Sequence, residues 1–174
     1  MASGPAQPVV LDATVLSNFA SSDAVTWLGD VLVRPVTVPT VQSELDRGYE
    51  EGHAFLANAV DPLGGVIDVV ETGTAVATPD RSAVRKRLDP GEAEALLQAD
   101  QADGTLATDD LAARRLAETR DVPVTGSIGL LALGVDRDSL DVATANEWLS
   151  TWRSERGYYA PVDHVEDLLR GDDG

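Results

Sequence analysis

The sequence predicts an α/β fold in which a parallel β-sheet lies between layers of helices, giving three layers. The pattern of apolar residues supports this prediction. Short apolar stretches rich in β-branched residues alternate with longer stretches of helical periodicity. Strands separated by helices pair in parallel and are joined by right-handed crossovers. Because the chain has 174 residues, no internal repeat and no low-complexity segment, residues 1–174 are expected to form a single domain.

The first part of the chain is expected to contain three strands. Val9–Leu11 is a short apolar run typical of a buried strand, and residues 13–20 continue as a helix. A β-rich stretch over Val31–Val38 ends at a proline, and a helix is expected to open at Thr40. Val66–Val70 is the third candidate strand.

A polar segment, residues 72–82, follows the third strand and is expected to be a loop and the most flexible part of the chain. Beyond it, strand and helix patterns alternate again. The expected elements are a helix opening at Asp89-Pro90-Gly91-Glu92, a strand over Thr105–Thr108, a helix over Asp110–Arg120, a strand over Val122–Val124, a helix after Gly126, and closing helices over Leu140–Trp152 and Val162–Leu169.

The chain is strongly acidic, with 30 Asp and Glu against 13 Lys and Arg and a formal net charge of −17. Lys86 is the only lysine. Such a charge repels polyanions at ordinary salt. An acidic, lysine-poor surface is also typical of halophilic proteins, and in molar salt the Debye length is only about 3 Å. We therefore interpret the charge as a sign of a high-salt habitat, where repulsion of RNA is screened.

Composition excludes several classes of protein and site. Cysteine is absent, so the chain has neither disulfides nor a thiolate zinc site. No run of about 18 apolar residues is present to span a membrane. The opening MASGPAQPVVLDA lacks the basic and apolar regions of a secretory signal, so the expected location is the cytoplasm. His53 and His164 stand apart and are expected to be surface residues, which disfavours zinc.

Acidic residues follow two of the predicted strands directly. Asp12 comes after the apolar run VVL, and Asp109 and Asp110 come after TLAT. Ligands of open parallel sheets bind beyond the carboxyl ends of the strands, where these residues are expected. Each could instead serve as a helix N-cap, a position that favours Asp. Two such positions in one sheet favour a shared pocket.

Two further helix openings carry candidate acids. Glu44 shares a helical face with Val41 and Leu45, so it is expected on or beside a buried stripe; the alternative is a capping acid. Glu92 and Glu94 open a later helix about 200° apart, so only one of them can face a common centre. Carboxylates gathered in this way repel one another unless a hard cation is present, which favours Mg²⁺ or Mn²⁺.

Four sequence blocks, in order, carry a resemblance to a known family: VVLDATVLSNFA, VPTVQSEL, LDPGEAEALLQA and LATDDLAARRLAETRDVPVTGSIGLL. With the tail RGYYAPVDHVEDLL, the chain resembles the PIN-domain family over nearly its whole length. The resemblance implies a parallel sheet between helices, an acidic pocket with Mg²⁺ or Mn²⁺, and hydrolysis of RNA. Many members are VapC-type toxins of type II toxin–antitoxin pairs, which dimerise and are inhibited by a small antitoxin.

The resemblance also implies roles for individual residues. It places Asp12 as the first acid, Glu44 as the second, and Asp109 or Asp110 as the fourth. The third stays open, because Glu94 fits the following Ala-Leu-Leu pattern and Glu92 fits the distance to Thr108. Except for Glu44, these acids are the candidate metal ligands. The small polar residues expected to support them or to hold water are Thr14, Ser17, Asn18 and Thr108.

Other features allow more than one interpretation. Arg114 and Arg115 could reach substrate phosphates or serve as solvated ion-pair partners. Trp148 and Trp152, with Tyr158-Tyr159, could form a dimer interface or cap the chain's own core. The turn Gly126-Ser127-Ile128-Gly129 lacks phosphate-loop spacing and is interpreted as punctuation between a strand and a helix.

Two other functional classes compete with a nuclease. A domain phosphorylated on Asp12, either a phosphatase or a receiver, is disfavoured because position 14 is Thr and the single lysine lies in a polar segment. A PIN fold that serves as a non-catalytic scaffold is the more serious alternative. Measured metal affinity discriminates between them, because a scaffold does not need to hold Mg²⁺.

Overall fold

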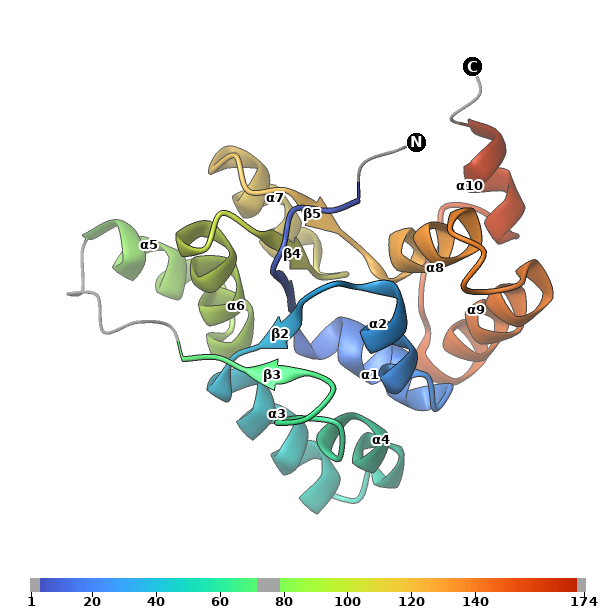
Figure 1. Cartoon of the computed structure of the whole chain (residues 1–174). Coiled ribbons are helices and arrows are strands. Elements are labelled where there is room, and N and C mark those ends of the chain that lie inside the picture. Colours follow the sequence, from blue (N-terminus) through green and yellow to red (C-terminus); the bar gives the residue numbers. More distant parts are fainter. Residues whose placement is uncertain (1–3, 72–78, 172–174) are drawn as a thin grey trace.

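A computed structural model describes residues 4–71 and 79–171 of the chain. Within these ranges, five strands form one all-parallel sheet in the order β3-β2-β1-β4-β5 (Figure 1). The strands are β1 (Val9–Leu11), β2 (Pro35–Thr37), β3 (Asp68–Val69), β4 (Thr105–Ala107) and β5 (Val124–Thr125). Helices lie on both sides of the sheet (Figure 1), so the predicted three-layer α/β fold is confirmed.

The helices follow the strands in the alternation that parallel pairing requires. In the described residues they are α1 (Ala13–Ser21), α2 (Val25–Val31), α3 (Pro39–Glu50), the 3₁₀ turn η1 (Ala54–Leu56), α4 (Ala57–Val60), α5 (Pro79–Arg87), α6 (Pro90–Gln101), α7 (Leu111–Thr119), α8 (Ser127–Asp136), α9 (Val142–Arg156) and α10 (Val165–Gly171). α6 packs against β1 and β4, and α7 packs against β5. None of these helices is both long enough and apolar enough to cross a membrane.

Several predicted strands are longer than the observed ones, and of Val66–Val70 only Asp68–Val69 is strand. The stretch Val31–Val38 begins inside α2, because Val25, Leu28 and Val31 recur every three residues and bury one helical face; only Pro35–Thr37 is strand. The strand expected at Val122–Val124 instead begins at Val124. The residue before it, a proline, has no N–H to donate and contributes only its carbonyl, which accepts from the Leu106 amide.

The polar segment 72–82 is described only in part. Residues 72–78 lie outside the described residues, so the loop prediction is not tested there. From Pro79 the chain is helical rather than a loop. Proline suits the first position of a helix because its φ is already helical and because the backbone N–H at this position has no partner within the helix.

The sheet register brings two segments to one edge. Leu11 pairs with Ala107 as the last residue pair of β1 and β4. The amide of Asp12 donates to the carbonyl of Ala107 at 3.0 Å, and the amide of Thr108 donates to that of Thr125 at 2.9 Å. The residues that follow β1, β4 and β5 therefore leave the sheet side by side at its carboxyl edge.

The aromatic side chains near the C-terminus pack inside the chain. Trp152 is fully buried and lies edge-on to Phe19, with ring centroids 4.9 Å apart. Trp148 packs against Trp27 at 5.4 Å and against Phe19 at 6.3 Å. Of the two interpretations of these tryptophans, the structure therefore favours a cap on the chain's own core over a dimer interface. They give no support to self-association. Tyr159 differs, because 87% of it is exposed.

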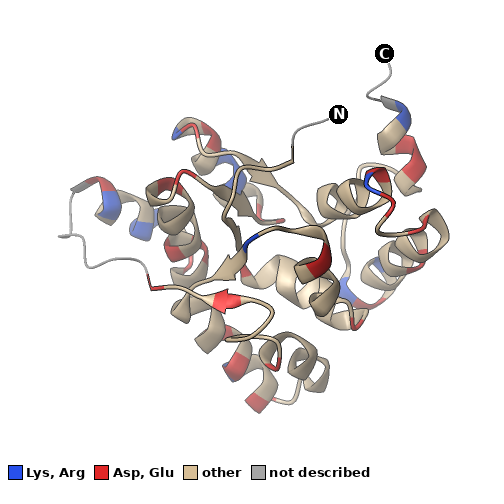
Figure 2. Ribbon diagram, viewed as in Figure 1, with Lys and Arg blue, Asp and Glu red and all other residues tan. Residues whose placement is uncertain are grey.

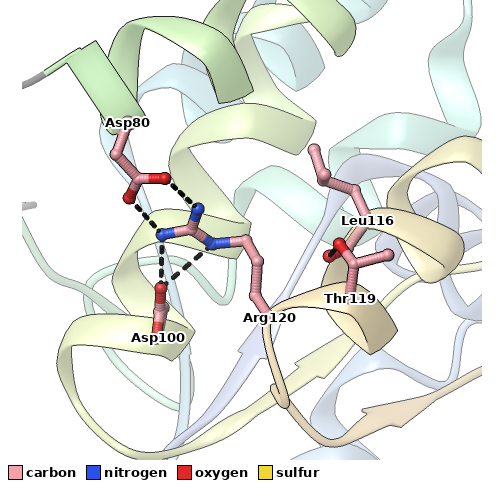
Figure 3. A network of polar contacts seen from close by, with 5 residues as sticks. All are labelled: Asp80, Asp100, Leu116, Thr119 and Arg120. Carbon is pink, nitrogen blue, oxygen red and sulfur yellow. Dashed lines mark hydrogen bonds and ion pairs between the residues drawn. The ribbon is translucent and has the colours of Figure 1, made fainter.

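One ion-pair network fixes α5 to the rest of the molecule. Arg120 follows α7, and its guanidinium lies between Asp80 of α5 and Asp100 of α6 (Figure 3). Both Nη atoms lie 2.8 Å from oxygens of Asp80, and Nη2 lies 2.7 Å from Oδ2 of Asp100. The paired geometry ties the helix that follows residues 72–78 to the two helices at its side.

Candidate active site

Asp12 stands directly after β1 and caps the N-terminus of α1. Its side chain is buried and accepts hydrogen bonds from the Val15 amide at 3.1 Å, the Thr14 hydroxyl at 2.6 Å and the Thr108 hydroxyl. Burial raises the pKa of Asp12 to about 6, although these hydrogen bonds act in the opposite direction. A buried carboxylate with a perturbed pKa at a strand end is a candidate functional group as well as a cap.

Asp109 follows β4 and is held from three elements. Ser127, the first residue of α8, donates its amide to Oδ1 at 2.8 Å and its hydroxyl to Oδ2. Asn18 of α1 donates its amide to Oδ2 at 2.9 Å. The amide of Asp109 donates to the Thr14 hydroxyl oxygen at 3.0 Å, so Thr14 bridges Asp12 and Asp109. Burial raises the pKa of Asp109 above its ordinary value.

Asp110 caps the N-terminus of α7. Its Oδ1 accepts from the Ala113 amide at 2.8 Å, and its own amide donates to the Thr108 hydroxyl oxygen at 3.1 Å. Thr108, which is buried, therefore links Asp12 to Asp110. Asp12 and Asp110 are both N-caps, as the alternative interpretation held, and both also lie at the carboxyl edge of the sheet.

The two glutamates at the start of α6 take different partners. Glu92 forms a capping box with Asp89, whose amide donates to Glu92 Oε2 at 3.3 Å. Glu94 extends toward α5, and its Oε1 lies 2.7 Å from Nε of Arg85. Their different directions follow from the turn of about 200° between them.

Four carboxylates influence one another, and we call them the carboxylate cluster: Asp12, Glu92, Asp109 and Asp110. Burial, then the charges of Asp110, Asp89 and Asp12, raise the pKa of Glu92 to about 7. The charge of Asp109 adds to the raised pKa of Asp12. The segments that follow β1 and β4 and the start of α6 thus bring like charges together.

Glu44 lies beside the cluster on α3. Its side chain is exposed rather than semi-buried as expected, because the buried stripe of α3 passes through Val41 and Leu45. Its Oε2 lies 2.7 Å from the position that a Cβ on Gly91 would occupy, so the Glu44 carboxylate lies directly against the start of α6. Partial desolvation of its carboxylate against α6, and the charge of Asp89, raise the pKa of Glu44.

The cluster can be tested against the requirements of a metal ion. Hard carboxylate and hydroxyl oxygens are the ligands that Mg²⁺ and Mn²⁺ prefer. The raised pKa values of Asp12 and Glu92 reflect burial and repulsion that a cation would relieve. In the described part of the chain, however, no three Asp, Glu or His side chains stand close enough to hold an ion as they are oriented. The oxygen ligands of the cluster fit Mg²⁺ or Mn²⁺ in chemical type. In this structure the carboxylates of Asp12, Asp109 and Asp110 accept hydrogen bonds from neighbouring protein groups.

Both arginines singled out from the sequence lie on α7. Arg114 donates from Nη1 to the Thr108 carbonyl at 3.1 Å, so its guanidinium lies next to the cluster. Arg115 is exposed and lines a pocket of about 260 Å³ between α5 and α7, with Arg87 and Leu116. Arg114 thus binds the backbone next to the carboxylate cluster, whereas Arg115 lies on a surface away from the cluster.

The remaining predicted residues are placed more simply. Ser17 is buried on α1. His53 and His164 are both exposed, as predicted.

Sequence reasoning missed two residues that contact this site. Ser127 was interpreted as part of a turn, but it is the first residue of α8 and lies two residues after the end of β5. It therefore lies at the carboxyl end of a strand, as Asp12 does. Arg156, at the end of α9, donates from Nε to Asn18 Oδ1 at 3.1 Å, and its guanidinium lies 5.2 Å from the centre of the Phe55 ring. No local pattern indicates this contact, because Arg156 and Asn18 are 138 positions apart.

Comparisons with known proteins agree with this architecture. A family model described as a PIN domain matches residues 8–171. This span includes all five strands and every residue of the carboxylate cluster. A search of curated proteins finds no match to the chain.

Proposed function

Because the chain belongs to the PIN-domain family, which has a nuclease-type fold, we propose that it is an endoribonuclease that hydrolyses RNA phosphodiester bonds with Mg²⁺ or Mn²⁺. The observation that carries the proposal is the carboxylate cluster at the carboxyl edge of the sheet, with buried Asp12 at its base. Asp12, Asp109, Asp110 and Glu92 would hold the ion. We assign the third acid to Glu92, because its pKa responds to Asp110 and Asp12 whereas Glu94 pairs with Arg85.

The residues of this chain would orient the carboxylates and the substrate. The bound cation would neutralise the scissile phosphate and activate the attacking water. Thr14 and Thr108 fix the directions of the Asp12 oxygens, and Asn18 and Ser127 fix those of Asp109. Glu44 is the exposed carboxylate beside the cluster and would act on the water or the leaving group.

The distribution of positive charge supports an RNA substrate despite the net charge of −17. Acidic residues are spread widely over the molecule, whereas α5 carries several of the few basic ones (Figure 2). Seven of the 13 basic residues fall between positions 81 and 120, on or directly after α5 and α7, the two helices beside the start of α6: Arg81, Arg85, Lys86, Arg87, Arg114, Arg115 and Arg120. Arg85 and Arg120 are paired with acids, so Arg114, next to the cluster, is the positive charge that favours a phosphate backbone there.

We extend the proposal to the biological role. The chain would be the toxin of a type II toxin–antitoxin pair acting in the cytoplasm of a halophilic cell, a homodimer with a small antitoxin as its partner. The family supports this role, and a small reading frame directly upstream of the gene is the expected accompaniment. A light-scattering mass of two chains at high salt is the expected outcome for the free protein.

The deciding experiment is cleavage of a structured RNA. The wild type and Asp12→Asn are compared with Mg²⁺ or Mn²⁺, and with a chelator, across a salt series. Cleavage is expected only for wild type with metal. Equal cleavage by the variant, or cleavage unaffected by the chelator, would refute the metal-nuclease proposal and favour the scaffold function.

A further inference from the structure

A groove of about 590 Å³ opens directly beside Asp109 of the carboxylate cluster. It lies between α7, α8, α10 and the segment that follows α9. Its lining includes Asp109, Leu111, Arg114, Ile128, Tyr158 and Tyr159. The volume is that of a small-molecule site. The groove is therefore continuous with the proposed catalytic carboxylates and has an apolar wall.

The segment that carries the two tyrosines is held in place from several sides. α9 ends at Gly157, whose φ of 61° lies in the left-handed region that favours glycine. The amide of Tyr158 donates to the Trp152 carbonyl at 3.1 Å, and the two rings lie edge-on, 5.7 Å apart. Arg153 donates to the carbonyls of Val162 and Asp163. Tyr158 is thus a fixed wall of the groove.

Two side chains of the groove are unusually exposed for apolar residues. Tyr159 is 87% exposed and Leu111 is 58% exposed. Both line this one groove together with Asp109, although they are 48 positions apart in the sequence. Exposed apolar and aromatic side chains gathered at one place mark a binding site. Because Tyr158 is anchored, the neighbouring Tyr159 ring is presented to solvent with little freedom of its backbone to lose on binding.

Arg114 supplies positive charge where the groove meets the cluster. Its Nη1 lies 2.8 Å from the position that a Cβ on Gly126 would occupy, so glycine at that position makes room for the guanidinium. Arg114 lines the groove together with Asp109 and Tyr158. A guanidinium has five donors, and one of them is used on the Thr108 carbonyl. The others suit a phosphate.

We propose that this groove binds one unpaired nucleotide of the RNA, with its base stacked on Tyr159 and its phosphate on Arg114. The inference rests on the proposed nuclease function, because the groove is identified as a substrate site by its continuity with Asp109. An aromatic ring beside a cation is the pairing that binds single-stranded nucleic acid, and stacking accepts any base. A base within a duplex is already stacked, so the groove selects unpaired RNA.

The test measures binding and cleavage separately. Binding of a fluorescein-labelled oligoadenylate is followed by anisotropy with Ca²⁺, for wild type, Tyr159→Ala and Tyr159→Trp. Tyr159→Ala is expected to weaken binding roughly tenfold, the size of one lost stacking contact, and Tyr159→Trp to retain it. Tyr49→Ala is the matched control, because Tyr49 is also exposed but lies on α3, and it is expected to bind like wild type. Thermal unfolding verifies that each variant is folded.

Each outcome decides one of the two proposals. If wild type binds the oligoadenylate in a Tyr159-dependent way but does not cleave RNA with Mn²⁺, the groove stands and the nuclease function fails. If Tyr159→Ala binds and cleaves like wild type, the groove proposal fails and the nuclease function stands; a partner protein is then the better occupant. Failure of wild type to bind the oligoadenylate, or an equal loss of duplex binding in Tyr159→Ala, also overturns the groove proposal.

Discussion

Ser127 donates two hydrogen bonds to the carboxylate of Asp109, from its backbone amide at 2.8 Å and from its hydroxyl. The two residues are 18 positions apart, one after β4 and the other at the start of α8. The hydroxyl also accepts from the Asn18 amide at 3.2 Å. The first turn of α8, which follows β5, therefore sets the orientation of Asp109, which follows β4.

Ser127→Ala is expected to lower metal-dependent activity while the fold is kept. The hydroxyl lowers the pKa of Asp109, so its loss raises that pKa further and moves the acidic limb of the pH–rate profile to higher pH. Partners that orient a metal ligand typically contribute 10- to 100-fold, so a loss in that range is expected. The measurement is the rate of RNA cleavage against pH, with exposed Ser150→Ala as control. An unchanged profile would show that the backbone amide alone orients Asp109.

The burial of Asp12 predicts a stability that depends on pH. Its pKa is 3.8 ordinarily and about 6 in the folded chain, so between these values the folded state keeps a proton that the unfolded state has released. Rising pH therefore destabilises the fold across this window, by an amount on the order of 3 kcal/mol. Asp12→Asn removes this titration and is expected to be more stable than wild type at pH 8 without metal, with the advantage fading toward pH 4.

Urea unfolding in chelator at pH 4, 6 and 8 measures this effect. Asp141 provides a control of opposite sign, because it is also a helix N-cap but the Thr144 amide lowers its pKa. Its stabilising contribution is present above pH 3.8 and is lost as the pH falls through the lower folded pKa. Asp141→Asn should therefore destabilise at pH 8. A difference between Asp12→Asn and wild type that stays constant with pH would contradict the assigned pKa.

Some of this site follows directly from the sequence. Acids after VVL and TLAT were expected to meet, because the carboxyl ends of parallel strands share one edge, and Thr14 now bridges Asp12 and Asp109 there. The helix beginning near Asp89 was expected from its Asp-Pro-Gly-Glu opening, which forms a capping box and begins at Pro90. The capping box succeeds because its partners lie within one helical turn, and the meeting of the acids succeeds because parallel strands share one carboxyl edge.

Other features depend on contacts between distant segments. The choice between Glu92 and Glu94 depends on Arg85, which lies on a different helix. Val31 is β-branched and was assigned to a strand, yet it is helical because Val25 and Leu28 share its buried face. The exposure of Glu44 depends on α6, whose glycine at position 91 leaves space for its carboxylate. None of these partners is visible in a local pattern.

The different partners of Glu92 and Glu94 predict different responses to metal. Glu92→Gln is expected to raise the Mn²⁺ concentration that gives half-maximal thermal stabilisation roughly tenfold, because it removes a carboxylate from the proposed ion site. Glu94→Gln breaks the pair with Arg85 but should leave the Mn²⁺ response unchanged. Metal affinity of wild type should rise from pH 6 to 8, since the pKa of Glu92 is about 7. The reverse result for the two variants would assign the third acid to Glu94.

The charge distribution predicts that RNA binding loses little affinity as salt rises. Each phosphate contact contributes about −0.7 to the slope of log affinity against log salt for single strands, and near the proposed path only a few basic residues are available. Arg114→Gln should make the slope shallower by about 0.7, whereas Arg115→Gln, on the surface away from the cluster, should leave it nearly unchanged. Arg34→Gln is the matched control, because Arg34 is exposed but precedes β2 at the opposite end of the sheet. Anisotropy of labelled single-stranded RNA from low to molar salt measures the slope. A steep wild-type slope, or an equal change in Arg34→Gln, would show that binding is diffuse and electrostatic rather than directed by the cluster and its neighbouring groove.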